Sequence, residues 1–354
     1  MDINRIDNHK LMYHPERVAD WIRGKNIYPI YAEISPSGSC NHRCIFCALD
    51  FMEYKPNFID SQILKTCISE LSRLGLKSIM FAGEGEPLLH NDIASIIEHT
   101  KQSGIDIALT TNGVLLNQTL AHAILKNCTW IKVSIDAGTA ETYSKIHRTK
   151  SSDFDKVITN LDQLCRIRNF YNYKCTIGAQ LILLPENSHE VQSLAIKLKQ
   201  IGVDYLVLKP YSQHPLSKTK IYKDIHYVYD SLSEQLSKLN DTNFNVIFRT
   251  NTIEKWNAQK KPYTQCQALP FWTYITASGD VYGCSMYLKD DNFKYGNINE
   301  NTFQEIWEGK KRHGSFINTI YNLDTTKCRV NCRMDEINRY LHDLTHPSGH
   351  VNFI

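Results

Sequence analysis

Apolar and polar positions change their period repeatedly along the first part of the chain. From residue 29 to about 210, short runs rich in β-branched and aromatic residues alternate with longer stretches that place apolar residues at helical spacing. The short runs predict strands at residues 28–34, 78–82, 106–110, 130–135, 176–184 and 205–208. The longer stretches predict helices at residues 61–74, 92–102, 118–126, 154–168 and 189–200. The positions of helix ends fit this reading, with N-cap residues at Asp60, Asn91 and Asn117 and terminating glycines at Gly75 and Gly104.

This alternation predicts an α/β fold built from parallel βαβ units. Six strands are too few for a closed eight-stranded barrel, so we expect a partial (β/α)6 TIM-like barrel, with its chemistry at the C-terminal ends of the strands. After residue 243 the alternation is lost, and short strands are predicted instead. We divide the chain into an N-terminal extension (1–27), the partial barrel (28–215), a linker helix (216–243), a small cysteine-rich domain (244–335) and a C-terminal helix with its tail (336–354).

Composition narrows the class of protein. The formal net charge is +3, from 40 basic and 37 acidic side chains, which gives no electrostatic sign of a nucleic-acid partner. The polar N-terminus does not resemble a signal peptide, and no apolar run is long enough to span a membrane. We therefore expect a cytoplasmic protein without a membrane partner. Its 11 cysteines are an odd number in a reducing compartment, which favours metal or redox chemistry over disulfides.

Seven cysteines form two groups with ligand-like spacing, and the first group follows the first predicted strand. Cys40, Cys44 and Cys47 can bind three irons of a cubane and leave the fourth iron open for a small molecule. Zinc is the competing interpretation, but a structural zinc ion needs a fourth ligand. His42 is available, yet it lies inside the loop, where it would strain that geometry. The spacing favours an iron–sulfur cluster.

The sequence Cys-Asn-His-Arg-Cys-Ile-Phe-Cys resembles the C-x3-C-x-aromatic-C signature of the radical S-adenosylmethionine (SAM) superfamily, and the resemblance covers most of the chain. It implies a [4Fe–4S] cluster on Cys40, Cys44 and Cys47 whose open iron is chelated by the amino and carboxylate groups of SAM. It also implies that Phe46, in the aromatic position, packs near the adenine.

The turn after the second predicted strand, Gly83-Glu84-Gly85-Glu86-Pro87, resembles the GGEP motif of the same family, which binds the SAM amino group. Aligned to the proline, Glu86 takes the place of the acidic ligand, and the role of Glu84 stays open. Taken alone, the same residues are also typical of a tight glycine turn.

Weaker matches lie at the next strand ends. Thr111 and Asn112 close the third strand, Ser134 and Asp136 close the fourth, and all four are candidates to bind the SAM ribose or methionine. Arg148 resembles the basic residue that meets the SAM carboxylate in related enzymes, although a surface salt bridge explains it nearly as well. Farther along, Gln180, Lys209 and Tyr211 are candidates to face the substrate, with buried or rim roles as the alternative.

The second group of cysteines resembles the SPASM and twitch extensions that follow radical SAM barrels. Cys266 precedes Gly279 by twelve intervening residues, Cys284 follows after four more, and Cys328-x3-Cys332 supplies two further thiols. Four cysteines fit the shorter twitch form with one auxiliary [4Fe–4S] cluster, which would serve electron transfer or structural support. A zinc ion held by all four thiolates is the alternative.

The resemblance implies a radical SAM enzyme, an oxidoreductase or epimerase that reductively cleaves SAM to a 5′-deoxyadenosyl radical and abstracts a hydrogen atom. We expect a small substrate, namely a sugar, cyclitol or nucleotide-linked sugar, and a flavodoxin- or ferredoxin-type electron donor. A peptide-modifying maturase is the alternative, and a non-catalytic zinc-binding interaction protein is a remote one. The sequence assigns no catalytic hydrogen donor or base.

Overall fold

The computed structural model describes residues 6, 8–225, 230–258, 260–329 and 332–353, so parts of the predicted N-terminal extension and linker helix lie outside the described residues. Its strands are β1 (Tyr31–Ile34), β2 (Ser78–Phe81), β3 (Asp106–Thr111), β4 (Trp130–Ser134), β5 (Thr176–Leu183), β6 (Tyr205–Pro210), β7 (Asn245–Phe248), β8 (Trp272–Ile275), β9 (Asp280–Tyr282) and β10 (Lys294–Asn297). Its α-helices are α1 (Pro15–Ile22), α2 (Ser61–Arg73), α3 (Ile93–Gln102), α4 (Gln118–Asn127), α5 (Ala140–His147), α6 (Ser152–Phe170), α7 (Val191–Ile201), α8 (Asp230–Ser237), α9 (Thr250–Ala258), α10 (Phe303–Glu308), α11 (Lys310–Asn322) and α12 (Asp335–Thr345). Short 3-10 helices lie at Leu11–Tyr13, Asp50–Met52, Pro87–Leu89, Ser188–Glu190, Leu269–Phe271, Ser285–Tyr287 and Thr325–Lys327.

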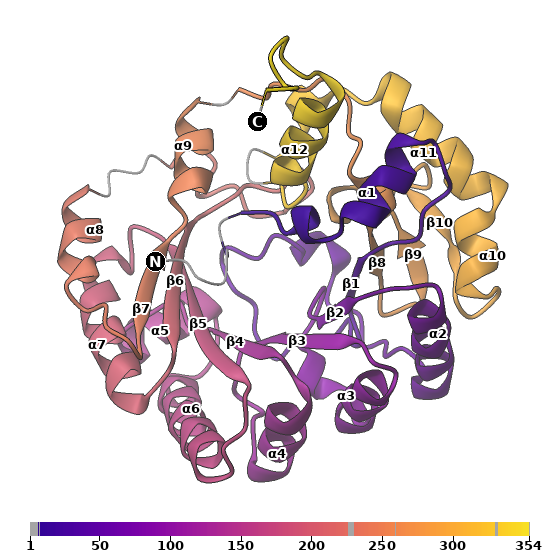
Figure 1. The fold of residues 1–354 in the computed structure, drawn as a ribbon. Helices are drawn as coiled ribbons and strands as arrows, with labels where there is room; N and C mark the ends of the chain where they lie inside the picture. The colour runs from indigo at the N-terminus through magenta and orange to yellow at the C-terminus, as the bar shows by residue number, and fades with distance from the viewer. Residues whose placement is uncertain (1–5, 7, 226–229, 259, 330–331, 354) are drawn as a thin grey trace.

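All strands belong to one curved sheet in the order β10-β9-β8-β1-β2-β3-β4-β5-β6-β7 (Figure 1). Neighbours are parallel from β8 through to β7, and only the β8–β9 and β9–β10 pairs are antiparallel. The predicted α/β fold with a partial barrel is confirmed. The C-terminal segment extends the sheet at both edges, because β7 pairs with β6 and β8 pairs with β1.

The main hydrophobic core lies between the strands and the helices on the outer side of the ring, including α2, α3, α4, α6 and α7 (Figure 1). Along β4, Ile131 and Val133 are buried in this core, whereas Lys132 and Ser134 are only half-buried. Side chains of a strand point alternately to its two faces, so the polar residues of β4 face the inside of the ring. The alternation therefore separates a packed outer layer from an interior that holds polar side chains beside a small apolar cluster of Met80, Ala82 and Ala108.

Local signals set most of the predicted helix ends. Asp60 accepts hydrogen bonds from the N–H groups of Gln62 and Ile63 at the start of α2, and Asn117 caps α4. The predicted cap at Asn91 is displaced by one residue, because α3 has Asp92 at its N-cap without a side-chain bond. Among the described residues, no helix combines the length and apolarity that crossing a membrane requires.

Hydrogen bonds join the C-terminal segment to the first βα unit of the barrel. The Glu70 carboxylate of α2 accepts hydrogen bonds from the N–H groups of Phe303 (2.7 Å) and Gln304 (3.1 Å) at the start of α10. Nearby, the indole N–H of Trp307 donates to the carbonyl oxygen of Ile27 at 2.7 Å. A buried carboxylate at a helix N-terminus satisfies N–H groups that have no partner within the helix.

We predict that Glu70→Ala lowers the free energy of unfolding by about 1–3 kcal/mol, because the buried N–H of Phe303 and the partly buried N–H of Gln304 lose their acceptor. The midpoint of thermal unfolding measures the loss, and Glu70→Gln, which keeps one acceptor oxygen, should fall between the two proteins. Glu98→Ala, which removes an exposed carboxylate from α3, serves as the control. An unchanged midpoint for Glu70→Ala would show that this cap does not stabilise the fold.

Candidate active site

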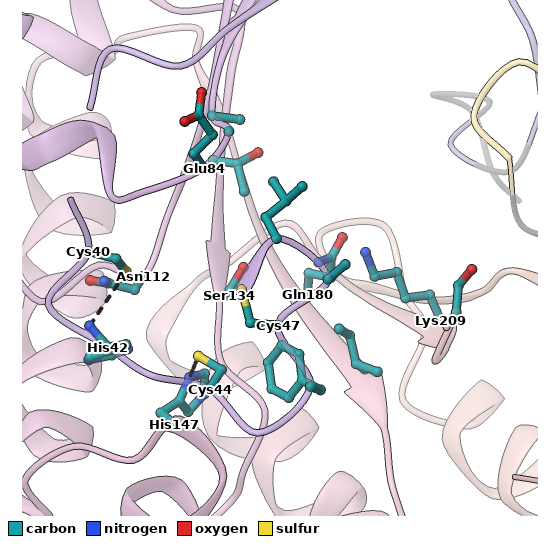
Figure 2. A pocket seen from close by; sticks show the side chains of 18 of the residues that line it. Cys40, His42, Cys44, Cys47, Glu84, Asn112, Ser134, His147, Gln180 and Lys209 are labelled. Atoms are coloured by element: carbon teal, nitrogen blue, oxygen red, sulfur yellow. Dashed lines mark hydrogen bonds between the residues drawn. The ribbon is translucent and has the colours of Figure 1, made fainter. Parts of the chain in front are cut away.

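A cavity of about 330 Å³ opens at the C-terminal ends of the parallel strands (Figure 2). Successive strands contribute to its wall, as expected for a parallel barrel. The lining includes Cys40, Phe46, Gly83, Glu84, Gly85, Glu86, Thr111, Asn112, Ser134, Gln180, Lys209, Tyr211, Arg249 and Arg329. The structure thus brings the first predicted cysteine group, the glycine turn and the ends of β3 to β6 together around one space.

The three cysteines of the loop after β1 are free thiols that line this cavity. Burial raises the pKa of Cys40 to about 12, and burial likewise raises the pKa of Cys44 and of Cys47 above the usual range. Such thiols become thiolates when a metal centre supplies positive charge. The donor set is therefore suited to a metal or an iron–sulfur cluster.

Distances between ligand atoms separate these two possibilities. Among the described residues, His42, Cys44 and His147 form the only group of three or more His, Cys, Asp or Glu side chains whose ligand atoms all lie within 4.8 Å of one another. Sulfurs around a single zinc ion would be about 3.8 Å apart, given Zn–S bonds of about 2.3 Å. At least two of the Cys40, Cys44 and Cys47 sulfurs are therefore more than 4.8 Å apart, which is wider than one zinc ion requires and fits a cubane whose thiolates each bind a different iron.

His147 was not singled out by any sequence motif. It ends α5, a helix that the apolar pattern did not predict, and its ring is buried with Nδ1 3.1 Å from the Cys44 sulfur. The N–H of Asp136 donates to Nε2 at 3.3 Å. Burial and the neighbouring His42 lower the pKa of His147 well below its usual value, so the imidazole is neutral.

The glycine turn after β2 lies directly against the cysteine loop. Gly83 has φ of +110°, and a Cβ atom on it would lie 2.4 Å from Cβ of Ser35. A Cβ atom on Gly85 would lie 2.0 Å from the carbonyl oxygen of Ser39, the residue before Cys40. Glycine at these two positions therefore permits the close approach of the two loops.

The two acidic residues of this turn have different surroundings. Glu86 is buried and accepts hydrogen bonds from the Thr111 hydroxyl (2.6 Å) and from the N–H groups of Asn112 (2.8 Å) and Leu88 (3.1 Å). A carboxylate has about four acceptor positions, so Glu86 keeps little capacity for a ligand. Glu84 accepts a hydrogen bond from the N–H of Ala277, and burial raises its pKa to about 7. Glu84 thus has more acceptor capacity left than Glu86.

The remaining predicted SAM contacts divide into two sets. Phe46, Thr111, Asn112 and Ser134 line the cavity. Within that set, the Asn112 amide also donates to the side chain of Asn41 in the cysteine loop at 2.6 Å.

Two predicted SAM contacts, Asp136 and Arg148, are not among the residues that line the cavity. Asp136 is buried behind the wall, where it accepts a hydrogen bond from the N–H of Ile182 at 2.6 Å, and burial raises its pKa to about 7. Arg148, the C-cap residue that follows α5, has the left-handed conformation with φ of +47°, and its side chain is exposed. The geometry gives neither residue a direct contact with a ligand in the cavity.

The second group of cysteines also comes together, beside β8 and β9. Cys266, Cys284 and Cys332 pack at the edge of one hydrophobic cluster, and Cys328 lies 3.8 Å from the hydroxyl of Tyr287. Burial and then the neighbouring Cys332 raise the pKa of Cys284 well above the usual range. Because no three of these sulfurs lie within 4.8 Å of one another among the described residues, this set also fits a cluster better than one zinc ion.

Basic side chains occupy the β6 and β7 side of the cavity. Lys209 was a candidate from the sequence, but Arg249 and Arg329 were missed because no motif surrounds them. Burial lowers the pKa of Lys209 to about 7, and the positive charges of Lys132 and Arg249 add to this effect. Arg329 directly follows Cys328, so the second cysteine group adjoins the cavity that the first group lines.

Comparison with known proteins identifies both parts of the chain. Residues 34–196 match the model of the radical SAM superfamily, and residues 266–333 match that of SPASM, an iron–sulfur cluster-binding domain. The GTP 3′,8-cyclase of Aquifex aeolicus is 25% identical over 78% of this chain and 88% of its own length. The GTP 3′,8-cyclase of Chlorobaculum tepidum is also 25% identical, but the match spans only 59% of this chain and 62% of that protein.

Solved structures show the same fold. Streptococcus suis SuiB bound to SAM superposes with a TM-score of 0.65 at 18% identity, over 96% of this chain and 79% of SuiB. The enzyme anSMEcpe with bound SAM gives a TM-score of 0.59 at 19% identity, over 82% of this chain and 84% of that one. The two matched domains imply SAM, a SAM-binding [4Fe–4S] cluster and an auxiliary [4Fe–4S] cluster as cofactors. This chain belongs to the radical SAM superfamily and carries a C-terminal SPASM-type iron–sulfur cluster-binding domain.

Proposed function

We propose that this radical SAM enzyme abstracts a hydrogen atom from a small substrate, a sugar, cyclitol or nucleotide-linked sugar, and thereby oxidises or epimerises it. The observation that carries the proposal is the shared cavity, with Cys40, Cys44 and Cys47 on one wall and Arg329, next to Cys328, on another. The cluster and SAM would occupy part of this cavity of about 330 Å³, so the space left favours a compact substrate.

Each part of the chain has a defined task in this proposal. Cys40, Cys44 and Cys47 hold the SAM-binding cluster, and Cys266, Cys284, Cys328 and Cys332 hold the auxiliary cluster. When bound, the reduced first cluster and SAM supply the 5′-deoxyadenosyl radical that takes the hydrogen atom. A flavodoxin- or ferredoxin-type protein is the proposed electron donor.

The SAM ligands in this proposal are side chains and backbone at the ends of β1 to β4. With SAM bound, Phe46 would pack on the adenine, and the backbone of Gly83 and Gly85 together with Glu84 would bind the amino group. Glu86 acts by holding Thr111 and Asn112 in place, which the two hydrogen bonds that it accepts from these residues support. We assign Asp136 a positioning role beside His147 rather than a contact with SAM.

The residues that line the cavity favour oxidation of the substrate. Epimerisation would need a cysteine that returns a hydrogen atom to the substrate radical. Among the described residues, the thiols that line the cavity are those of Cys40, Cys44 and Cys47, all assigned to the cluster. A substrate radical formed there has no free thiol in the lining to return a hydrogen atom. The adjoining auxiliary cysteines offer instead a site for an electron acceptor.

A peptide substrate is the second candidate. Solved relatives of the same fold carry peptides, since SuiB was solved with the precursor peptide SuiA and anSMEcpe with the Cp18Cys peptide. The relatives named GTP 3′,8-cyclase point instead to a nucleotide-bearing small molecule. The basic side chains of the cavity support a nucleotide-bearing small molecule rather than a peptide.

Deuterium transfer tests the proposal directly. Anaerobic protein, SAM and dithionite are incubated with a nucleotide-linked sugar deuterated in its sugar ring, and 5′-deoxyadenosine is analysed by mass spectrometry. Incorporation of deuterium is the expected result. Incorporation of deuterium only from a deuterated peptide would support the maturase alternative. A zinc-loaded protein that forms no 5′-deoxyadenosine would refute the assignment as a radical SAM enzyme.

Replacement of Cys40, Cys44 and Cys47 together by alanine should abolish 5′-deoxyadenosine formation, because the open iron is lost with its ligands. Iron analysis of the anaerobically purified variant should still find about four irons per chain at the auxiliary site. The triple variant Cys67→Ala, Cys128→Ala and Cys165→Ala is the control, since these thiols are buried in the core. Continued SAM cleavage without the loop cysteines would contradict the assignment.

Replacement of Cys284 or Cys328 by serine should remove about four irons per chain, because a cubane that loses a thiolate ligand is released or degraded. The visible absorbance of the iron–sulfur clusters and the iron content per chain measure the loss. If the iron content stayed the same, these thiols would not be cluster ligands.

A further inference from the structure

Positive charge is concentrated on one side of the cavity. Lys209 lies near the end of β6, Arg249 directly follows β7, and Arg329 follows Cys328, and all three line the cavity. The acidic side chains of the lining, Glu84 and Glu86, follow β2 and already accept hydrogen bonds from the chain. Figure 2 shows Lys209 on the side of the cavity away from Cys40.

Lys209 is surrounded mainly by groups of its own sign. Lys132, Arg249 and Arg329 face it, and Asp136 is the acidic group in its surroundings. The described residues include no hydrogen bond or ion pair to the Lys209 ammonium. Burial, Lys132 and Arg249 lower the pKa of Lys209 to about 7, so the folded chain itself provides poor compensation for this charge. An anion in the cavity would provide it.

Arg329 is held in position for such a ligand. Its Nε and Nη2 atoms donate to the side chain and the carbonyl oxygen of Ser212 at 3.1 Å and 2.9 Å. These two bonds fix the plane of the guanidinium beside the cavity. A pre-oriented guanidinium loses little conformational entropy when it binds a phosphate.

The first turn of α9 adds a further attraction for negative charge. The first backbone bond of this helix runs from the N–H of Ile253 to the carbonyl oxygen of Arg249, and Thr252 lines the cavity. The helix N-terminus therefore lies at the same side as Lys209. Its partial positive charge favours an anion there.

From these contacts we propose that Lys209, Arg249, Arg329 and the first turn of α9 bind a phosphate or diphosphate group of the substrate. The inference rests on the proposed function and narrows its substrate class to phosphorylated small molecules. The bound phosphate would fix the substrate between the two cysteine groups.

The SAM carboxylate is the competing occupant. Family resemblance places that group on the open iron, next to Cys40, Cys44 and Cys47. Lys209 projects from the other side of the cavity (Figure 2). The test must therefore measure the affinity for SAM and for a phosphate probe separately.

Isothermal titration calorimetry tests the proposal on the anaerobically reconstituted protein, saturated with SAM and titrated with pyrophosphate or with malonate. We expect one pyrophosphate to bind, and malonate to bind much more weakly. Lys209→Met and Arg249→Gln should each weaken pyrophosphate binding roughly tenfold to hundredfold, as expected for loss of a charge-assisted hydrogen bond. Lys145→Met, which removes an exposed lysine from α5, is the matched control and should change nothing.

The proposal would be overturned by no pyrophosphate binding to the unmodified protein, by equal affinity for malonate, or by unchanged affinity in both variants. A larger loss of SAM affinity than of pyrophosphate affinity would also overturn it, by assigning the cations to SAM. Iron content and circular dichroism verify that each variant is folded and loaded. A protein that forms 5′-deoxyadenosine but binds no pyrophosphate would refute this inference alone, whereas one that binds pyrophosphate but never cleaves SAM would refute the proposed function.

Discussion

The close contact between the cysteine loop and the glycine turn is the constraint on which the rest of the site depends. Gly85 allows the turn after β2 to touch the backbone of Ser39, and the N–H of Glu86 donates to the Ser39 carbonyl oxygen at 2.8 Å. The Glu86 carboxylate then holds the end of β3 through Thr111 and Asn112. A buried carboxylate with several donors is well satisfied and rigid, so the first three strand ends form one unit that carries the cysteines.

The C-terminal domain is joined to this unit rather than tethered loosely to it. β8 pairs in parallel with β1, and the Glu84 carboxylate accepts a hydrogen bond from Ala277 just beyond β8. The second cysteine group follows from this placement, and Arg329 reaches the cavity from it. The first set of thiols and the cations thus line one cavity, and the second set adjoins it through Arg329, the residue after Cys328.

The sequence predicted the features that depend on local patterns. Buried parallel strands appear as apolar runs, so β2 and β3 were found with their ends within a residue or two, and the cysteine loop and glycine turn were recognisable from spacing. Long-range pairing has no such signal. The contact of β8 with β1 joins residues far apart in sequence, and Arg249 and His147 reach the site only through β7 and α5, whose placement depends on the whole barrel.

The proposed chemistry requires that the open iron of a cluster on Cys40, Cys44 and Cys47 binds SAM inside this cavity. Electron–nuclear double resonance of the reduced protein with SAM labelled by ¹⁵N at its amino group tests it most directly. A hyperfine coupling between that nitrogen and the cluster is the expected result, because the amino group would bind the open iron. A cluster spectrum that does not change when labelled SAM is added would contradict it.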